Sequence, residues 1–234
     1  FGDTNGISVS LRHALREIQK NNYPVDILVC SNNIKEEPHL RVLKPITEFP
    51  MPGYANQIFR IPDLLSVHKV MTEGGYDRVM ASTELCMGAV ALYLKQAFHV
   101  PAFFFVHTDW LEFAKMTLSL DKAALARLRR ILRAFYKSFD GLFTLNSEHR
   151  EWLTGQSMQI SPQKVHPTNH WIDPAVFYPE NSSRRSMFPI KPIHKPLLMY
   201  AGRLSHEKGV LELPRFMEII KQRHPEATIV IAGE

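Results

Sequence analysis

Strand-like apolar runs alternate with helical patterns along this chain, and that order restricts the folds open to it. The runs that read as strands occupy residues 25–30, 41–43, 77–81, 100–106, 141–145 and 165–166. Helical patterns fill residues 8–20, 64–74, 87–98 and 121–138, and a further helix begins near residue 147. Strands that alternate with helices predict right-handed β-α-β units, and hence an α/β fold in which helices cover a parallel sheet.

A break in this order comes after residue 177. Residues 178–186 are polar and lack periodicity, and three prolines follow at 189, 192 and 196. Such a stretch is typical of a linker, so we predict a first domain over residues 1–180, a linker over 181–195 and a second domain over 196–234. The second domain opens as a strand at 197–201, a helix at about 208–223 and a strand at 227–232.

Charge and composition exclude several kinds of partner. The net charge is +5, from 28 Lys and Arg against 23 Asp and Glu. This suits an anionic small molecule or weak attraction to anionic lipid, and is too small to indicate nucleic-acid binding. No apolar run approaches the roughly 20 residues of a membrane-spanning helix. Cys30 and Cys86 lack metal-ligand spacing, and two isolated buried thiols predict a reducing, cytoplasmic location.

Two loops in the first domain carry candidate site residues, because ligands of doubly wound sheets bind at the carboxyl ends of strands. Asn5 and Gly6 precede the first predicted helix, where backbone amides can approach a phosphate or a sugar. An ordinary turn with Ser8 as helix cap is the alternative. His107 and Asp109 leave the strand at 102–106, where an imidazole can donate to a sugar hydroxyl or a developing charge. A structural histidine bonded to a nearby carbonyl remains equally open.

A third strand end in the first domain can be explained without a ligand. Ser147 follows the strand that ends at Leu145, and its role as helix cap, with Glu148 in the first turn, explains both residues without a substrate.

A basic amphipathic helix is also predicted over 121–138. It can lie on an anionic membrane, although a solvated outer helix looks much the same.

The most informative motif is YAGRLSHEKG at residues 200–209. An apolar run stops at Gly202, Arg203 and Lys208 follow, and a helical pattern begins at Val210. A strand, a glycine turn, two cations and a helix N-terminus together suit a phosphate-bearing ligand. Arg supplies a planar fork of donors and Lys a point charge, which can neutralise a diphosphate. A solvated loop whose cations pair with Glu207 is the weaker alternative.

This motif, with IVIAGE at 229–234, resembles the opening of the donor domain in retaining glycosyltransferases of family four, which have the GT-B fold of two Rossmann-like domains. Residues 3–8 resemble the first glycine loop of that family. Residues 107–109 resemble the strand-end histidine motif of its mannosyl- and glucosyltransferase-like branch. Ile172 and Asp173, with Phe177 and Pro179, resemble the stretch that closes the first domain, so the resemblance covers nearly the whole chain.

The resemblance implies transfer of a hexose from a nucleotide diphosphate sugar, UDP- or GDP-linked, to a glycan, lipid or small-molecule acceptor. Transfer would retain the anomeric configuration and need no metal or other cofactor. By similarity, Arg203 and Lys208, beside Gly202, hold the donor diphosphate and stabilise the leaving charge. The backbone at Asn5 and Gly6 approaches the donor phosphate or the acceptor, and two lobes close over the donor.

The same resemblance assigns the acceptor side of the cleft. His107 is expected to contact the transferred sugar, and Asp109, Ser147 and Trp171 to line the acceptor side. Trp171 departs from the family, whose members usually have Gly there, so the loop geometry or the acceptor contact differs.

Other departures concern the ends of the chain. The family's first strand is expected before Phe1, and its paired glutamates and its base and ribose contacts beyond Glu234. We therefore expect an N-terminal GT-B domain plus the first β-α-β of the second, cut at both ends and inactive alone. A nucleotide-sugar epimerase of the same fold and a non-catalytic sugar- or lipid-binding module are the alternatives.

Overall fold

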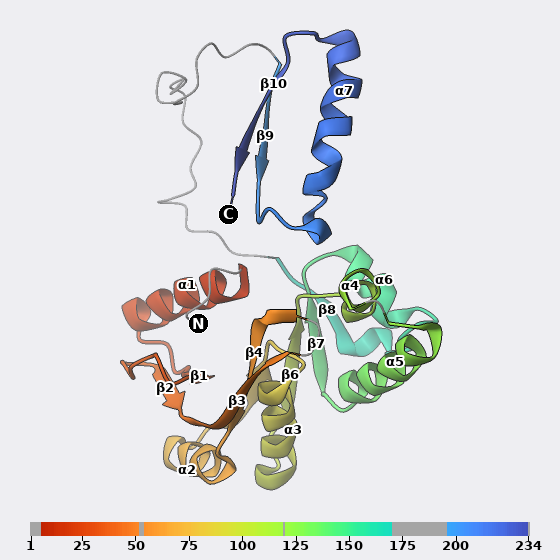
Figure 1. Ribbon diagram of the computed structural model, residues 1–234. Coiled ribbons are helices and arrows are strands. Elements are labelled where there is room, and N and C mark those ends of the chain that lie inside the picture. Colours follow the sequence, from red (N-terminus) through yellow and green to blue (C-terminus); the bar gives the residue numbers. More distant parts are fainter. Residues whose placement is uncertain (1–5, 52–53, 119, 170–195, 234) are drawn as a thin grey trace. The chain divides into compact units, whose positions relative to one another are not determined.

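The computed structural model describes residues 6–51, 54–118, 120–169 and 196–233 (Figure 1). The chain divides into two compact units, residues 1–173 and 174–234. The linker predicted over 181–195 lies outside the described residues, so the proposed domain boundaries stay a prediction.

The first unit carries the predicted α/β alternation, and its elements are labelled in Figure 1. They are α1 (Gly6–Asn21), β1 (Ile27–Cys30), β2 (Leu40–Leu43), β3 (Pro45–Met51), β4 (Tyr54–Pro62), α2 (Leu64–Gly74), β5 (Val79–Ala81), α3 (Cys86–Phe98), β6 (Ala102–Val106), α4 (Trp110–Thr117), α5 (Lys122–Lys137), β7 (Gly141–Thr144), α6 (Ser147–Thr154) and β8 (Val165–Pro167). Strands β5–β6–β7–β8 form a parallel sheet in that order, and β1 and β2 form a separate parallel pair. The predicted parallel sheet flanked by helices is therefore confirmed.

The β3–β4 hairpin, helix α4 and the start of helix α1 depart from the sequence prediction. Strands β3 and β4 form an antiparallel hairpin, in which the rings of Phe49 and Phe59 stack with centroids 5.4 Å apart. Helix α4 inserts eight residues of helix between β6 and α5. Helix α1 also begins at Gly6, which places Ser8 inside the helix and 5 % exposed. Ser8 is therefore not the cap of this helix.

The core of the sheet forms where α5 packs over β6. Alternate residues of β6, Ala102, Phe104 and Val106, are fully buried, as the two-residue period of a strand requires. The ring of Phe104 meets three rings from or just after α5, those of Phe135, Tyr136 and Phe139, with centroids 5.1–5.6 Å apart. The apolar stripe of the basic helix is thus explained by packing onto the sheet.

Helix α3 belongs to two apolar clusters at once. Its Ala91 packs with the sheet and α5, while Val90 and Leu94 pack with Met71 of α2 and Leu43 of β2. Because successive faces of one helix serve both clusters, α3 couples the β1–β2 side of the unit to the four-stranded sheet.

The second unit contains one β-α-β motif, as predicted. Strands β9 (Leu197–Ala201) and β10 (Thr228–Ala232) are parallel neighbours, and α7 (Leu213–Arg223) connects them. The α-helix begins later than predicted, because two 3-10 turns, η3 (His206–Lys208) and η4 (Val210–Glu212), come first. Pro214 explains the delay, since its ring would clash with the carbonyl one turn earlier in an α-helix but is tolerated in a first turn.

Candidate active site

The carboxyl ends of three neighbouring strands bring the candidate residues of the first unit to one edge of the sheet. Ala81 pairs with Phe104 in the register of β5 and β6, and Val106 pairs with Thr144 in that of β6 and β7. The loops that follow these strands therefore leave the sheet side by side. They carry Glu84, then His107 and Asp109, then Asn146 and Ser147.

His107 leaves β6 in a half-buried position. Its ring lies 4.2 Å, centroid to centroid, from the ring of Phe105 and is tilted by 50°. The position at the edge of the sheet agrees with the sequence prediction. Contact with a transferred sugar stays a prediction.

Asp109 caps the helix that follows it. Its Oδ1 accepts hydrogen bonds from the backbone amides of Leu111 and Glu112, at 2.9 and 3.0 Å. The residue therefore has a structural role at the start of α4. Its predicted contact with an acceptor remains a prediction.

The cap of α6 is Asn146 and not Ser147. Asn146 Oδ1 accepts a hydrogen bond of 2.7 Å from the backbone amide of His149. Asn caps helices as well as Ser does, so either residue could have been chosen from sequence. Ser147 is the exposed first residue of the helix, with Glu148 in the first turn as predicted.

Three of the residues predicted to contact a ligand lie in or near parts of the chain that the structure does not describe. Asn5 and Trp171 lie outside the described residues. Gly6 is the exposed first residue of α1, and a Cβ atom built on it would meet nothing within 4 Å among the described residues. Among the described residues of the first unit, nothing fills the space beside Gly6, and a ligand contact there stays a prediction.

In the second unit, one tyrosine side chain supports the loop that carries Arg203 and Lys208. The hydroxyl of Tyr200, on β9, donates a hydrogen bond of 2.8 Å to the carbonyl of Arg203 and lies 3.5 Å from that of Lys208. The side chains of Arg203 and Lys208 are exposed. Gly209 then turns the chain with a left-handed φ of 70°, which favours glycine.

Close backbone packing at the base of this loop explains the glycine at position 233. The amide of Gly202 donates a 3.0 Å hydrogen bond to the carbonyl of Ala232. A side chain at Gly233 would overlap the carbonyl of Gly202. The carboxyl ends of β9 and β10 are thus held together where the loop begins.

The predicted site residues belong to both units. His107, Asp109 and Ser147 lie in the first, and Gly202, Arg203 and Lys208 in the second. That one active site uses both groups stays a prediction.

Glu84 is a residue of this edge that the sequence analysis missed. The hydroxyl of Tyr136, on α5, donates a 2.9 Å hydrogen bond to Glu84 Oε1. Burial raises the pKa of Glu84 to about 7, although the side chains of Trp110 and Tyr136 act in the opposite direction. No local motif marks this residue, because its partners come from helices far along the chain.

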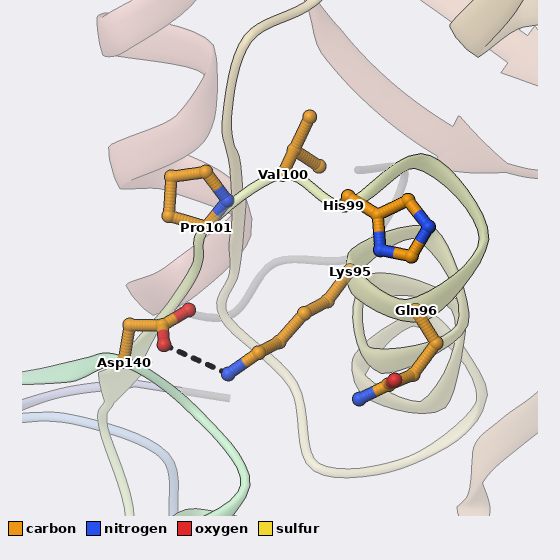
Figure 2. Close-up of a pocket in the computed structure, with 6 residues that line it drawn as sticks. All are labelled: Lys95, Gln96, His99, Val100, Pro101 and Asp140. Carbon is orange, nitrogen blue, oxygen red and sulfur yellow. Dashed lines mark hydrogen bonds and ion pairs between the residues drawn. The ribbon is translucent and has the colours of Figure 1, made fainter.

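A hollow of about 370 Å³ opens at the opposite edge of the sheet (Figure 2). Pro101 and Asp140, which line it, directly precede β6 and β7. Lys95 Nζ contacts Asp140 Oδ1 and the carbonyl of Ser138, both at 2.8 Å, and Asp140 Oδ2 accepts from the amide of Ala102. These charges hold α3 to the sheet, and the hollow lies away from the strand ends where ligands bind.

Only some of the basic side chains of helix α5 are exposed to solvent. Arg127, Arg129 and Arg130 are exposed, and so is Ile131 at 65 %. Arg133 instead donates to the carbonyl of Ser157, at 2.6 Å. None of the helices in the described ranges is long and apolar enough to span a membrane.

The two thiols are less buried than predicted. Cys30 and Cys86 are both free and half-buried, and burial raises the pKa of each. Within the described ranges, no group of three or more His, Cys, Asp or Glu side chains is placed to hold a metal ion. Metal independence stays a prediction.

Comparison with known proteins assigns the family. Residues 4–176 match the model of the family described as Glycosyltransferase Family 4, which takes in the parallel sheet and the loops at its carboxyl edge. The match ends before Arg203 and Lys208. The curated proteins gave no match. Since the matched region is most of the chain, this protein belongs to Glycosyltransferase Family 4, whose activity is glycosyl transfer.

Proposed function

We propose that this chain serves a hexosyltransferase that uses a nucleotide diphosphate sugar, UDP- or GDP-linked, and retains the anomeric configuration without a metal. Arg203 and Lys208 bind the diphosphate and stabilise the charge on the leaving group. His107 contacts the transferred sugar. Asp109 and Ser147 belong to the acceptor side.

The observation that carries this proposal is the support of the Arg203–Lys208 segment. Both backbone carbonyls face one hydroxyl, that of Tyr200, while both cationic side chains are exposed at the carboxyl end of a parallel strand. A preorganised pair of cations costs less to order around an anion than a mobile loop does. The family assignment adds a sugar donor and an acceptor as the expected ligands.

Donor binding tests the proposal directly. Titration calorimetry would compare UDP-, GDP- and ADP-sugars with the free nucleotides. Arg203→Ala and Lys208→Ala are each expected to weaken diphosphate binding about ten-fold or more, from the loss of a charged hydrogen bond. Arg215→Ala and Lys221→Ala, two exposed cations of α7, are matched controls that leave binding unchanged. Equal effects at all four positions would refute the assignment.

Product analysis of the full-length protein separates the alternatives. A glycoside that keeps the donor's anomeric configuration, formed equally in the presence of EDTA, supports retaining, metal-independent transfer. An epimerised nucleotide sugar supports the epimerase. Sugar binding with no product supports a non-catalytic module.

We extend the proposal to location. The two free thiols support a reducing cytoplasm, and the exposed arginines of α5 support peripheral contact with anionic lipid.

A further inference from the structure

Glu84 lies next to the loop that carries His107, at the carboxyl edge of the sheet. Glu84 comes three residues after Ala81, as His107 comes three residues after Phe104, and Ala81 and Phe104 are paired in the register of β5 and β6. The side chain of Glu84 is only partly exposed. A carboxyl group in such a place needs partners, and two aromatic side chains supply them.

The first partner is a fixed hydroxyl. Tyr136 is 0 % exposed and packs edge-on against the rings of Phe135 and Trp152. Its hydroxyl donates a hydrogen bond of 2.9 Å to Glu84 Oε1. Because the Tyr136 ring is locked in the core, Glu84 is held at a defined position.

The second partner is the indole of Trp110. Its Nε1 is buried and has no partner in hydrogen-bonding geometry among the described residues. It nevertheless lies close enough to the Glu84 carboxyl to lower its pKa. A buried donor without an acceptor is costly, so an ionised carboxylate beside it is favourable. Trp110 directly follows Asp109, the cap of α4.

We propose that Glu84 is a positioning residue for the loop over His107 and Asp109, acting through the indole N–H of Trp110. The carboxylate is anchored by Tyr136 on one side and attracts the indole on the other. It therefore fixes the first residue of α4, and with it the backbone that leaves β6. The proposal rests on the proposed transferase function, because the loop is assigned there to the sugar and the acceptor.

Protonation weakens this arrangement. An ionised carboxylate accepts the hydrogen bond of Tyr136 and attracts the indole N–H of Trp110, whereas the neutral acid does both less strongly. Among the described residues, the titratable groups that act at this place are Tyr136 of α5, which donates to the carboxyl, and Asp109 at the start of α4, whose charge helps to raise the pKa of Tyr136. With a pKa of Glu84 of about 7, the loop tightens as pH rises through neutrality.

Indole NMR tests the contact without any assay of activity. The ¹⁵N–¹H cross-peak of Trp110, assigned with Trp110→Phe, is expected to shift with a midpoint near the pKa of about 7. In Glu84→Gln, which keeps the volume, the shift is absent. Tyr136→Phe removes a hydrogen bond that lowers the pKa of Glu84, so the midpoint moves to higher pH. A Trp110 peak that titrates identically in all three proteins overturns the proposal.

Transferase kinetics test the consequence. Wild-type activity is expected to fall on the acid side of pH 7, and this limb disappears in Glu84→Gln and moves to higher pH in Tyr136→Phe. At pH 8, Glu84→Gln is expected to raise the acceptor KM several-fold. His107 is present in all of these proteins, so the differences between them isolate Glu84.

The two possible failures are distinct. Transfer with one common pH profile in wild type, Glu84→Gln and Tyr136→Phe overturns the positioning role. A wild type that transfers no sugar refutes the proposed function, and the Trp110 titration still decides whether Glu84 controls the loop.

Discussion

The hydroxyl of Tyr200 donates a hydrogen bond of 2.8 Å to the carbonyl of Arg203, which ties the end of β9 to the loop that follows it. The carbonyl of Lys208 lies 3.5 Å from the same hydroxyl. Both predicted donor-binding cations therefore have their backbone fixed from one point.

Removing that hydroxyl should weaken donor binding without unfolding the protein. Tyr200→Phe is expected to lower affinity for UDP or GDP several-fold, since the loop must then be ordered on binding. The free energy of unfolding should fall by about 1 kcal/mol or less, because the Arg203 carbonyl is left to water. Calorimetric titration and urea unfolding measure the two. Tyr23→Phe, at a 52 % exposed position, should change neither, and equal losses in both variants would contradict this account.

Asp26 should make stability depend on pH. Its carboxylate accepts from Tyr76 Oη at 2.5 Å and Arg41 Nε at 3.1 Å. Burial raises the pKa of Asp26, but these hydrogen bonds outweigh burial and leave the pKa below its usual 3.8. A lowered pKa gives stability that is present above 3.8 and lost as pH falls through the folded-state value.

Asp26→Asn is therefore expected to lower the free energy of unfolding by about 1–3 kcal/mol at pH 7, with the deficit shrinking below pH 3.8. Urea unfolding across this range measures the difference. Asp77→Asn is the control, because the Asp77–Arg78 pair is exposed and should matter little. A deficit at pH 7 that persists unchanged at pH 2 would argue against the ionised network.

Glu84 should make the free energy of unfolding depend on pH in the opposite sense to Asp26. Its pKa is raised from 4.5 to about 7, so the folded state holds this proton more tightly than the unfolded state does. The resulting stability is present below pH 4.5 and lost as pH rises through about 7. Relative to Glu84→Gln, wild type should lose on the order of 3 kcal/mol over that range. Parallel stability curves for the two proteins would exclude a raised pKa.

At Gly88, replacement by alanine is expected to destabilise the protein, because there is no room for a methyl group. A Cβ atom there would lie 2.7 Å from Phe135 Cζ and would also overlap the carbonyl of Thr83. Gly88→Ala should lower the free energy of unfolding by about 1–3 kcal/mol through overpacking, although alanine is the better helix former. Denaturant unfolding measures the loss. Gly6→Ala, where the space is open, should cost nothing.

Membrane contact, if α5 provides it, should depend on three exposed arginines. Replacing Arg127, Arg129 and Arg130 together by Gln is expected to reduce co-sedimentation with anionic vesicles about ten-fold or more at low salt, since each such charge contributes about 1 kcal/mol. High salt should abolish binding by the wild type. Arg133 is left unchanged, because it holds the carbonyl of Ser157.

The matching control removes the same charge elsewhere. Lys20, Lys69 and Arg78 are exposed cations outside α5, and their joint replacement by Gln should leave vesicle binding unchanged. Equal loss in both triple variants would indicate net charge alone.

The elements that the sequence predicted well are those with a strong period and a clear stop. The helix predicted over 64–74 ends there because Gly75 adopts a left-handed φ of 60°. The continuous apolar run at 102–106 predicted a buried strand, and in the structure its residues alternate between the core and the opposite face.

The elements that the sequence analysis missed depend on features other than hydrophobic periodicity. The β3–β4 hairpin contains Pro45 and Pro50, which ordinarily argue against a strand, yet the pairing shifts register beside both prolines. Helix α4 could have been found from Asp109 and Glu112, whose spacing is a capping signature. Glu84 had no such signal, since only the fold brings Tyr136 and Trp110 to it.

Pro214 has a consequence for the kind of attraction that the Arg203–Lys208 loop can exert. Because α7 starts only at Leu213, the loop does not end on the first turn of an α-helix, where a macrodipole would supply a fixed positive potential. Attraction of an anion then comes mainly from the exposed side-chain charges of Arg203 and Lys208. Such attraction is screened by salt, so the affinity for the donor should fall as the salt concentration rises.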